Sequence, residues 1–393
     1  MSYPMVELGE VCEVVSGATP KREVPAYWGG DVDWVTPKDL TDLEGRFIYE
    51  APEKITEAGY KSCSTHMVPA GSVLLSSRAP IGHLAITRRP VCTNQGFKNF
   101  ISGPKVDAEF LYWALKRDVP KLQAMGTGST FKEISKAQVE KYKIPLPPLP
   151  TQRRIAAILD KSQALVANDR RTLAVYDQLA KSLFLELFGD PVKNERGWEV
   201  VTLEDVSAEI IDCPHSTPEF VDGVTEYPCI RTSELGNGYI DWSSMKYLNE
   251  EGYVLRTKRM VPQAGDIVYG REGTFGEAAI VLERTMMSLR QRVMLFSPNK
   301  KKITSSYFWA ALRSDRVYRQ ALKHTSGSTV GHVNIKDIRK FTLPLPPINM
   351  QQRYASALKQ VEDHQAKCAA SLHRSEGLFG SLLQSAFAGG FGG

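Results

Sequence analysis

The sequence predicts an α+β protein made of two similar globular domains, each followed by a long helix. Two observations predict this architecture. Landmark motifs recur in the same order with a period of about 195–199 residues, and a long stretch that favours helix follows each copy. A period of this length indicates a duplicated domain, because the repeats of solenoid proteins are only ~20–50 residues long.

Length and composition are those of a globular protein. The chain has 393 residues, 42% of them hydrophobic and 24% charged, which is ample for two or three domains with buried cores. The first residues lack a basic stretch followed by an apolar one, and no apolar run approaches the ~20 residues of a membrane span. The six cysteines form no C-x-x-C pair, so we expect buried free thiols and a cytoplasmic location.

The charge distribution repeats along the chain. Residues 1–60 hold 5 basic and 12 acidic side chains, whereas residues 61–150 hold 13 basic and 5 acidic ones. Residues 199–255 hold 2 basic against 12 acidic, and residues 256–340 hold 17 against 6. Two concentrated basic regions suit a protein that binds a polyanion, although a single charge block is more often a solvated face.

The repeated landmarks span both copies. The matching segments are Trp34–Leu40 with Cys229–Leu235, Gly71–Leu75 with Gly265–Tyr269, Tyr112–Ala114 with Phe308–Ala310, and Ile144–Leu149 with Leu343–Ile348. Short β-type runs separated by glycine and proline, together with a helical stretch near each aromatic pair, predict that each domain is α+β with many loops.

The stretch after each proline-rich turn predicts a coiled coil. Residues 151–188 contain no glycine or proline, and apolar residues recur there at alternating steps of four and three. The first seam comprises Ile155, Leu159, Val166, Leu173, Tyr176, Ala180, Leu183 and Leu187. The second comprises Tyr354, Leu358, Val361, Cys368, Leu372, Phe379, Leu382 and Ala386.

Two such helices in one chain bury their seams most simply against each other, although either helix alone could equally pack on its own domain. Antiparallel pairing would relate the two domains by a pseudo-twofold axis. They could then contact two DNA segments separated by about one helical turn or more, ~34 Å. Gly377 and Gly380 disfavour helix, so we expect irregular last turns in the second helix.

Motifs of catalysis are missing from the sequence. It contains no G-x-x-x-x-G-K-[ST] phosphate loop, no [ND]-P-P-[FY] segment of amino-methyltransferases and no Glu-x-Lys of a common nuclease pattern. The seven histidines show no spacing typical of metal ligands. We therefore expect a non-catalytic protein without a metal or cofactor.

The whole chain resembles the DNA-specificity subunits of type I restriction–modification enzymes. The resemblance depends on Pro-Leu-Pro-Pro segments that precede Gln152-Arg153-Arg154 and Gln351-Gln352-Arg353, each leading into a long helix. The Gly-Ser-Thr motifs, Ser16-Gly-Ala-Thr-Pro20, Tyr27-Trp-Gly-Gly30 and Phe188-Gly-Asp-Pro191 add to it.

The resemblance implies two target-recognition domains, at residues 1–150 and 191–348, that each read one half of a bipartite double-stranded DNA target. It implies spacer helices at 151–190 and 349–393 that set the gap and dock two methyltransferase subunits. Restriction subunits would complete the complex, and methylation and ATP-dependent cleavage would belong to these partners. We expect the partner-binding residues at the helix starts: Gln152, Arg153, Arg154, Gln351, Gln352 and Arg353.

Basic side chains in glycine-rich loops are the candidates for DNA contact, because arginine favours guanine edges and lysine favours phosphates. In the first copy they are Lys21, Arg22, Lys38, Arg78 and Lys98. In the second copy they are His215, Arg231, Arg271, Arg290 and Arg292. For each, a solvated or ion-paired side chain is an equally good interpretation. Ser129, Thr130, Ser328 and Thr329 suit either phosphate binding or turn capping.

Two other classes of function compete with this interpretation. One is a methyltransferase or nuclease without a recognisable motif, which would bind S-adenosylmethionine as an isolated chain. The other is a scaffold that joins proteins through its coiled coil without binding DNA.

Overall fold

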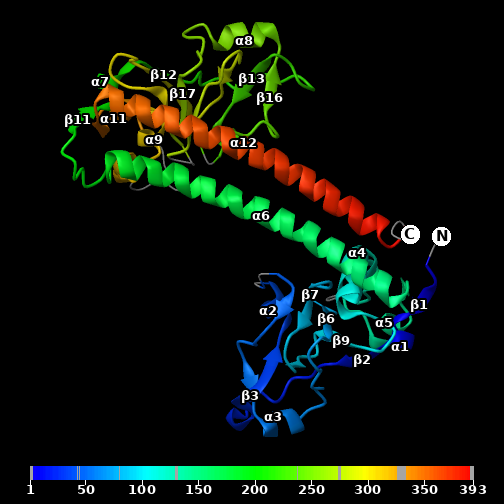
Figure 1. Cartoon of the computed structure of the whole chain (residues 1–393). Coiled ribbons are helices and arrows are strands. Elements are labelled where there is room, and N and C mark those ends of the chain that lie inside the picture. Colours follow the sequence, from blue (N-terminus) through cyan, green and yellow to red (C-terminus); the bar gives the residue numbers. More distant parts are fainter. Residues whose placement is uncertain are drawn as a thin grey trace. The chain divides into compact units, whose positions relative to one another are not determined.

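The structure, a computed structural model, describes residues 3–41, 43, 45–78, 80–128, 132–236, 238–272, 276–324 and 333–389 (Figure 1). Contacts divide the chain into two units. Unit 1 is Met1–Arg171 with Ala369–Gly393, and unit 2 is Thr172–Cys368. Each unit therefore contains one globular domain and a segment of both long helices, α6 (Leu149–Phe188) and α12 (Ile348–Ser385).

The first domain contains three small sheets. A five-stranded sheet has the order β2-β9-β6-β7-β4, a three-stranded sheet the order β5-β3-β8, and β1 pairs with β10. The strands are β1 (Met5–Glu7), β2 (Cys12–Ser16), β3 (Trp28–Val35), β4 (Phe47–Ile48), β5 (Lys54–Ile55), β6 (Val73–Ser76), β7 (Leu84–Thr87), β8 (Cys92–Thr93), β9 (Phe97–Ser102) and β10 (Lys143–Pro145). The helices are α1 (Leu8–Val11), a 3-10 turn η1 (Pro25–Tyr27), α2 (Pro37–Thr41), α3 (Glu57–Lys61), α4 (Ala108–Met125) and α5 (Lys136–Glu140).

The second domain repeats this plan. A four-stranded sheet has the order β12-β20-β17-β18, a three-stranded sheet the order β16-β13-β19, β11 pairs with β21, and β14 pairs with β15. The strands are β11 (Glu199–Thr202), β12 (Ser207–Asp212), β13 (Tyr227–Ile230), β14 (Leu235–Gly236), β15 (Tyr239–Ile240), β16 (Lys246–Leu248), β17 (Ile267–Gly270), β18 (Ala278–Ile280), β19 (Ser288–Leu289), β20 (Val293–Pro298) and β21 (Thr342–Leu345). The helices are α7 (Leu203–Val206), a 3-10 turn η2 (Thr232–Glu234), α8 (Glu250–Arg256), α9 (Ser305–Leu312), α10 (Asp315–Lys323) and α11 (Ile335–Ile338).

The two domains share most of their strands in the same order, which confirms the predicted duplication; β4 of the first domain and the β14-β15 pair of the second have no counterpart. The order β2-β9-β6-β7 corresponds to β12-β20-β17-β18, and the antiparallel pair β1-β10 corresponds to β11-β21. In both domains the central strand of the small sheet has one antiparallel and one parallel neighbour: β3 between β5 and β8, and β13 between β16 and β19. The fold class is therefore α+β with an internal repeat, as the sequence predicts.

In unit 1 the end of α12 completes the core of the first domain. Phe387 lies 5.3 Å from Phe110 of α4, and Phe379 lies 5.6 Å from Trp113, measured between ring centres. Ile155 and Leu159 of α6 belong to the same buried cluster. Farther along α6, Asp169 accepts a 2.8 Å hydrogen bond from Ser375 of α12. Residues later in α6 thus contact residues earlier in α12, so the two segments are antiparallel.

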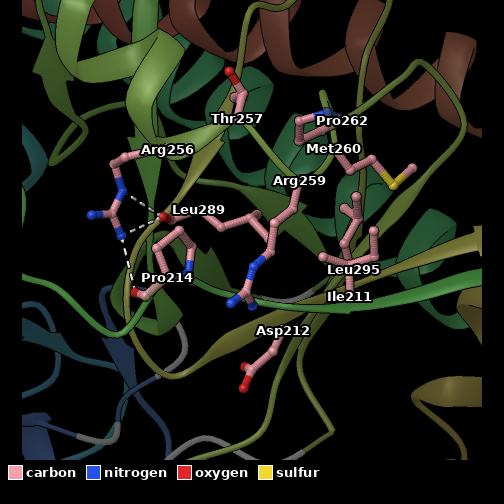
Figure 2. Close-up of a pocket in the computed structure, with 10 residues that line it drawn as sticks. All are labelled: Ile211, Asp212, Pro214, Arg256, Thr257, Arg259, Met260, Pro262, Leu289 and Leu295. Carbon is pink, nitrogen blue, oxygen red and sulfur yellow. Dashed lines mark hydrogen bonds between the residues drawn. The ribbon is translucent and has the colours of Figure 1, made fainter.

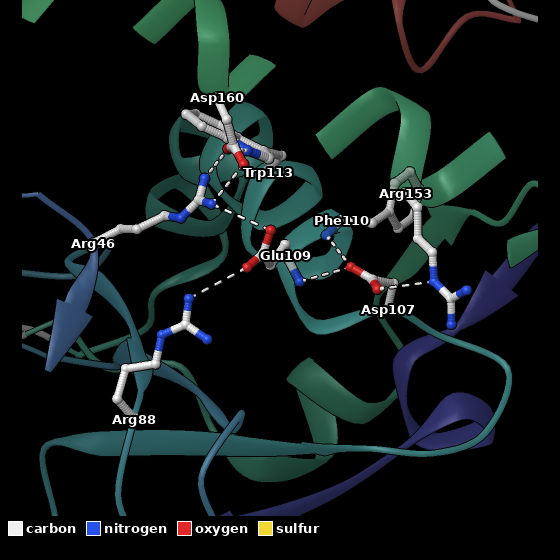
Figure 3. A network of polar contacts seen from close by, with 8 residues as sticks. All are labelled: Arg46, Arg88, Asp107, Glu109, Phe110, Trp113, Arg153 and Asp160. Carbon is white, nitrogen blue, oxygen red and sulfur yellow. Dashed lines mark hydrogen bonds and ion pairs between the residues drawn. The ribbon is translucent and has the colours of Figure 1, made fainter. Parts of the chain in front are cut away.

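A polar network also joins the first domain to α6 (Figure 3). Arg46, which precedes β4, pairs with Asp160 of α6, and the indole of Trp113 donates to the same carboxylate at 2.7 Å. Glu109 lies 3.3 Å from Arg46 and 3.5 Å from Arg88. Because the Arg46 side chain is only 14% exposed, its pairing holds a loop of the domain against the helix.

In unit 2 the same two helices pair through aromatic and polar contacts. The rings of Tyr176 and His364 stack with their centres 6.0 Å apart, and Gln365 donates to Asp177 at 2.7 Å. At the end of α6, Phe184 packs 5.8 Å from Tyr354 between ring centres. Here too the helices are antiparallel, which confirms the predicted pairing of their seams.

Burial along both helices follows the predicted seams. Every predicted apolar position of either seam is buried or half-buried, and the polar positions within the seams, such as Ser162 and Gln365, follow the same pattern. The expectation of irregular last turns in α12 is wrong. The helix runs unbroken through Gly377 and Gly380 to Ser385. Its packing against the core of the first domain, within unit 1, outweighs the low helix propensity of glycine.

Among the described residues, we find no helix with the length and apolar composition of a membrane span. Four of the chain's six cysteines are buried: Cys12, Cys92, Cys213 and Cys229. Burial raises the pKa of Cys12 to about 12 and that of Cys92 to about 11, so these thiols behave as small apolar groups.

Candidate nucleic-acid interface

In the second domain, strands of two sheets end at adjoining edges. β12 ends at Asp212 opposite Met294 of β20, and β17 ends at Gly270 opposite Val293. The parallel strands β13 and β19 end together at Ile230 and Leu289. Residues 290–292 run from the end of β19 to the start of β20, so they join the two edges.

These strand ends bring together all five basic candidates of the second copy. Arg231 follows β13, Arg271 follows β17, Arg290 and Arg292 lie between β19 and β20, and His215 follows β12. The backbone N–H of Arg271 donates to the carbonyl of Arg292 at 3.0 Å, and that of Arg290 donates to Ile230 at 2.7 Å. We call this group the strand-end surface of the second domain.

The first domain has the equivalent surface. β2 ends at Ser16 opposite Lys98, β6 ends at Ser76 opposite Phe97, and the parallel strands β3 and β8 end at Val35 and Thr93. Its five candidates lie in these strands or in the segments that follow them: Lys21, Arg22, Lys38, Arg78 and Lys98. We call them the strand-end surface of the first domain.

Acidic partners hold much of the second surface in place. Basic and acidic side chains alternate along the series His215, Asp212, Arg271, Glu272 and Arg292, with successive N–O distances of 3.1, 3.3, 3.4 and 3.5 Å. The Arg271 side chain is only 5% exposed, whereas those of His215 and Arg292 are 73% and 60% exposed. Arg271 is therefore a buried ion-pair partner beneath the surface, whereas His215 and Arg292 face solvent.

Arg290 lies near two other positively charged side chains, those of Arg231 and Arg256. Its guanidinium lies over the ring of Phe220, 4.5 Å from the ring centre. Burial lowers the pKa of Arg290, and the nearby charges of Arg231 and Arg256 lower it further. Glu234, which is fully buried, pairs with Arg231 at 3.2 Å and partly offsets this repulsion. An anion that bound here would relieve the remaining repulsion.

The cations of the first surface differ in exposure and in pairing. Lys21 and Lys38 are exposed, and Lys38 lies on the short helix α2 that follows β3. Lys98 is buried and bonds to Ser77 and Glu133, both at 3.3 Å. Arg22 pairs with Glu53, and its guanidinium lies 3.9 Å from the ring centre of Trp28. The ion-paired interpretation therefore fits Arg22 and Lys98 as they stand.

Comparison with known proteins gives the same family match in both halves of the chain. The family model for the type I restriction modification DNA specificity domain matches residues 2–174 and again 195–370. The chain belongs to this family. The expectation of a DNA-specificity protein with two reading domains and no catalytic role of its own is thereby confirmed.

Relatives and solved structures agree with this membership. A type I restriction enzyme MjaIX specificity subunit of Methanocaldococcus jannaschii is 28% identical over 91% of this chain and 86% of its own length. The MjaVIII specificity subunit of the same organism is 24% identical over 92% of this chain and 86% of its own length. The crystal structure of the S subunit from M. genitalium has the same fold, with a TM-score of 0.61 at 12% identity over 98% of this chain and 96% of that one. A structure from a type I R-M assembly gives 0.57 at 18% identity, over 99% and 98% of the two chains.

Described residues that follow the Gly-Ser-Thr motifs of this family member bind both strand-end surfaces. Ser129, Thr130, Ser328 and Thr329 themselves lie outside the described residues. Their flanks are anchored, because Ile134 donates its N–H to the carbonyl of Ser77 at 3.0 Å and Val333 donates to Arg271 at 3.5 Å.

The two glutamines expected to bind partners are fully buried in this specificity protein. The amide of Gln152 donates to the carbonyls of Lys105 and Pro147, at 2.9 and 2.8 Å, and its oxygen accepts from the N–H of Asp107. The Gln351 amide makes the corresponding bonds in unit 2. Because these side chains are 0% exposed, they hold the start of each helix to its domain and present no surface to a partner.

The neighbouring residues of the motif face outward. Arg153, Arg154, Gln352 and Arg353 are exposed at the starts of α6 and α12. Arg153 lies 3.7 Å from Asp107, the residue that caps α4 (Figure 3). These four remain the expected docking residues of the motif.

Sequence reasoning missed several residues that organise the surfaces. Glu133, Glu234 and Glu272 supply the negative charge, and Arg256 and Gln291 bind backbone carbonyls of the loop at 214–217. For Glu133, Arg256 and Gln291, separation in sequence from the groups they bind hid these roles. Among the described residues, no group of three or more His, Cys, Asp or Glu side chains could hold a metal ion.

Proposed function

We propose that this chain is the sequence-reading subunit of a type I restriction–modification complex, with one half of a bipartite DNA target read at each strand-end surface. One observation supports the assignment of these surfaces above all. The same strand ends carry the basic candidates in both copies of the domain, although most of the individual residues differ. A shared position with different side chains is what two readers of different sequences require.

The proposal divides the chain into reading and spacing parts. Residues 1–150 and 191–348 are the reading domains, and residues 151–190 and 349–393 are the spacer segments. Antiparallel helices of 40 and 38 residues are long enough, at 1.5 Å per residue, to extend over ~55–60 Å. That length exceeds one turn of DNA, ~34 Å, so the spacers can set a gap between two half-sites.

Partners supply the chemistry in this proposal. Two methyltransferase subunits dock at the helix starts, where Arg153, Arg154, Gln352 and Arg353 are exposed. Restriction subunits join through the complex, so methylation and ATP-dependent cleavage take place on partner chains in the cytoplasm. The present chain contributes the choice of sequence and the spacing.

Selection from randomised duplex DNA tests this function. The chain together with its methyltransferase partner should enrich two short base patterns separated by a fixed number of unspecified base pairs. The methyltransferase alone is the control and should enrich no such pattern. Enrichment of a single uninterrupted pattern, or of none, would refute the proposal.

A further inference from the structure

A buried guanidinium lies beneath the second strand-end surface. Arg256, the last residue of α8, is only 7% exposed, and within the described part of the chain no carboxylate lies within ion-pair distance of it. Its donors are satisfied by backbone carbonyls instead. It donates to Leu289 at 2.9 and 2.7 Å, to Ser216 at 3.1 Å and to Pro214 at 3.3 Å. Figure 2 shows the bonds to Leu289 and Pro214.

The carbonyls that Arg256 binds belong to the residues beside two DNA-contact candidates. Pro214 and Ser216 flank His215, and Leu289 precedes Arg290. Breaking these hydrogen bonds would leave a buried guanidinium without partners, which costs free energy. The bonds therefore fix the two backbone segments relative to one another.

Gln291, which lies between β19 and β20, binds the same loop. Its amide donates to the carbonyl of His215 at 2.7 Å and lies 3.4 Å from the hydroxyl of Thr217. Three successive carbonyls, those of residues 214–216, therefore accept hydrogen bonds from Arg256 or Gln291. With its backbone fixed in this way, the His215 side chain remains 73% exposed to solvent.

The first domain lacks this arrangement. Residues 59–60 and 252–253 are Gly-Tyr in α3 and α8, and three positions later Cys63 stands where the second domain has Arg256. The corresponding loop of the first domain is held by the indole of Trp34, which donates to the carbonyl of Ala18 at 3.0 Å. The guanidinium is thus a feature of the second reader alone.

We infer that Arg256 and Gln291 are positioning residues that hold His215 and Arg290 in one geometry and so determine which bases the second domain accepts. The inference rests on the proposed function. Base recognition requires side chains to be placed within about 0.5 Å, which a loop achieves only when its backbone is fixed. Neither residue needs to touch DNA for this role.

Two variants of the full chain, assembled with its methyltransferase partner, test the inference. Gln291→Ala removes an exposed side chain, so folding is preserved, and Arg256→Lys keeps the buried charge but loses most of the directed donors. Gln263→Ala is the matched control, because Gln263 is also exposed and donates to a backbone carbonyl, that of Val261, but precedes β17 and lies at the far end of that strand from the surface.

Each complex is measured on duplexes with single base changes in either half of the selected target. Both test variants should lose about tenfold in discrimination at one or more positions of the second half-site, the loss expected when a well-placed base contact is misaligned. Discrimination in the first half-site and binding to unrelated DNA should be unchanged. Gln263→Ala should match the unaltered chain.

Unchanged discrimination in the second half-site of Gln291→Ala would overturn the inference, as would an equal loss in both half-sites. These results differ from a failure of the proposed function. In that case the unaltered chain would itself select no two-part target.

Discussion

Gln152 and Gln351 make the same three hydrogen bonds in the two halves of the chain. Each amide oxygen accepts a backbone N–H at the start of a helix, that of Asp107 or Thr304, and each nitrogen donates to two carbonyls. Both side chains are 0% exposed. The repeated motif thus fixes the direction in which each long helix leaves its domain, a condition for any defined spacing.

Replacement of Gln152 by alanine should destabilise the fold. The change leaves an N–H and two carbonyls without their partner in a buried place, at about 1–3 kcal/mol for each unpaired group. We expect the free energy of unfolding to fall by about 3 kcal/mol in urea titrations, and similarly for Gln351→Ala. Gln352→Ala is the control, since an exposed change costs at most about 0.5 kcal/mol. Equal effects of Gln351→Ala and Gln352→Ala would contradict the assigned role.

The glycines of α12 should be replaceable with a gain in stability. A Cβ at Gly377 or Gly380 would meet no atom within 4 Å. Alanine at either position should therefore raise the free energy of unfolding by about 1 kcal/mol, the difference in helix propensity.

Gly17→Ala is the opposite case, because its Cβ would lie 2.2 Å from the carbonyl oxygens of Thr93 and Asn94. It should lower the free energy of unfolding by about 1–3 kcal/mol. Thermal unfolding of the three variants measures both effects. A loss of stability in Gly377→Ala would show that the end of α12 is not the regular helix described above.

Glu362→Gln should stabilise the protein at neutral pH. Burial raises the pKa of Glu362 above its ordinary value of 4.5; Lys359 opposes this shift and Asp363 adds to it. The folded state therefore takes up the proton more readily than the unfolded chain. The charged carboxylate is unfavourable above the folded pKa, and this penalty fades as the pH falls toward 4.5.

Urea unfolding at pH 7.5 and at pH 5 measures this difference. The variant should exceed the original chain most at the higher pH. Glu251→Gln is the control, because Glu251 is an exposed residue of α8 and should show no such gain. A gain from Glu362→Gln that grew as the pH fell would contradict the sign of the pKa shift.

Lys38→Ala should weaken DNA binding by the same factor on every sequence. Lys38 is an exposed cation on the first strand-end surface, and lysine suits phosphate contact. Loss of one such contact should lower the slope of log affinity against log salt by about 0.9. Lys143→Ala is the control, because Lys143 of β10 pairs with Glu7, which precedes β2, whereas the surface lies where β2 ends. An unchanged slope in Lys38→Ala would show that Lys38 does not contact DNA.

Patterns of regular spacing predicted the fold well. Repeated landmarks predicted the duplication, and steps of four and three predicted the helix seams, because both depend only on order along the chain. The irregular end of α12 was predicted wrongly, since the propensity of Gly377 says nothing of the core that Phe379 and Phe387 enter from the same helix end.

The candidate site was predicted in part. Loop position was enough to bring the basic residues of each domain to one set of strand ends. It was not enough to distinguish exposed Lys38 from Arg22, whose partner Glu53 lies 31 residues away. Arg256 escaped notice because its acceptors are backbone carbonyls 33 to 42 residues away, and no sequence motif marks a carbonyl.

The central claim is that two separate surfaces of one chain read two separate stretches of DNA. Hydroxyl-radical footprinting of the complex with its methyltransferase partner, on the selected target, tests it most directly. We predict two protected blocks with a less protected gap, and loss of only the block over the second half-site when Arg290 is replaced by alanine. One continuous block, or equal weakening of both blocks by Arg290→Ala, would contradict the account.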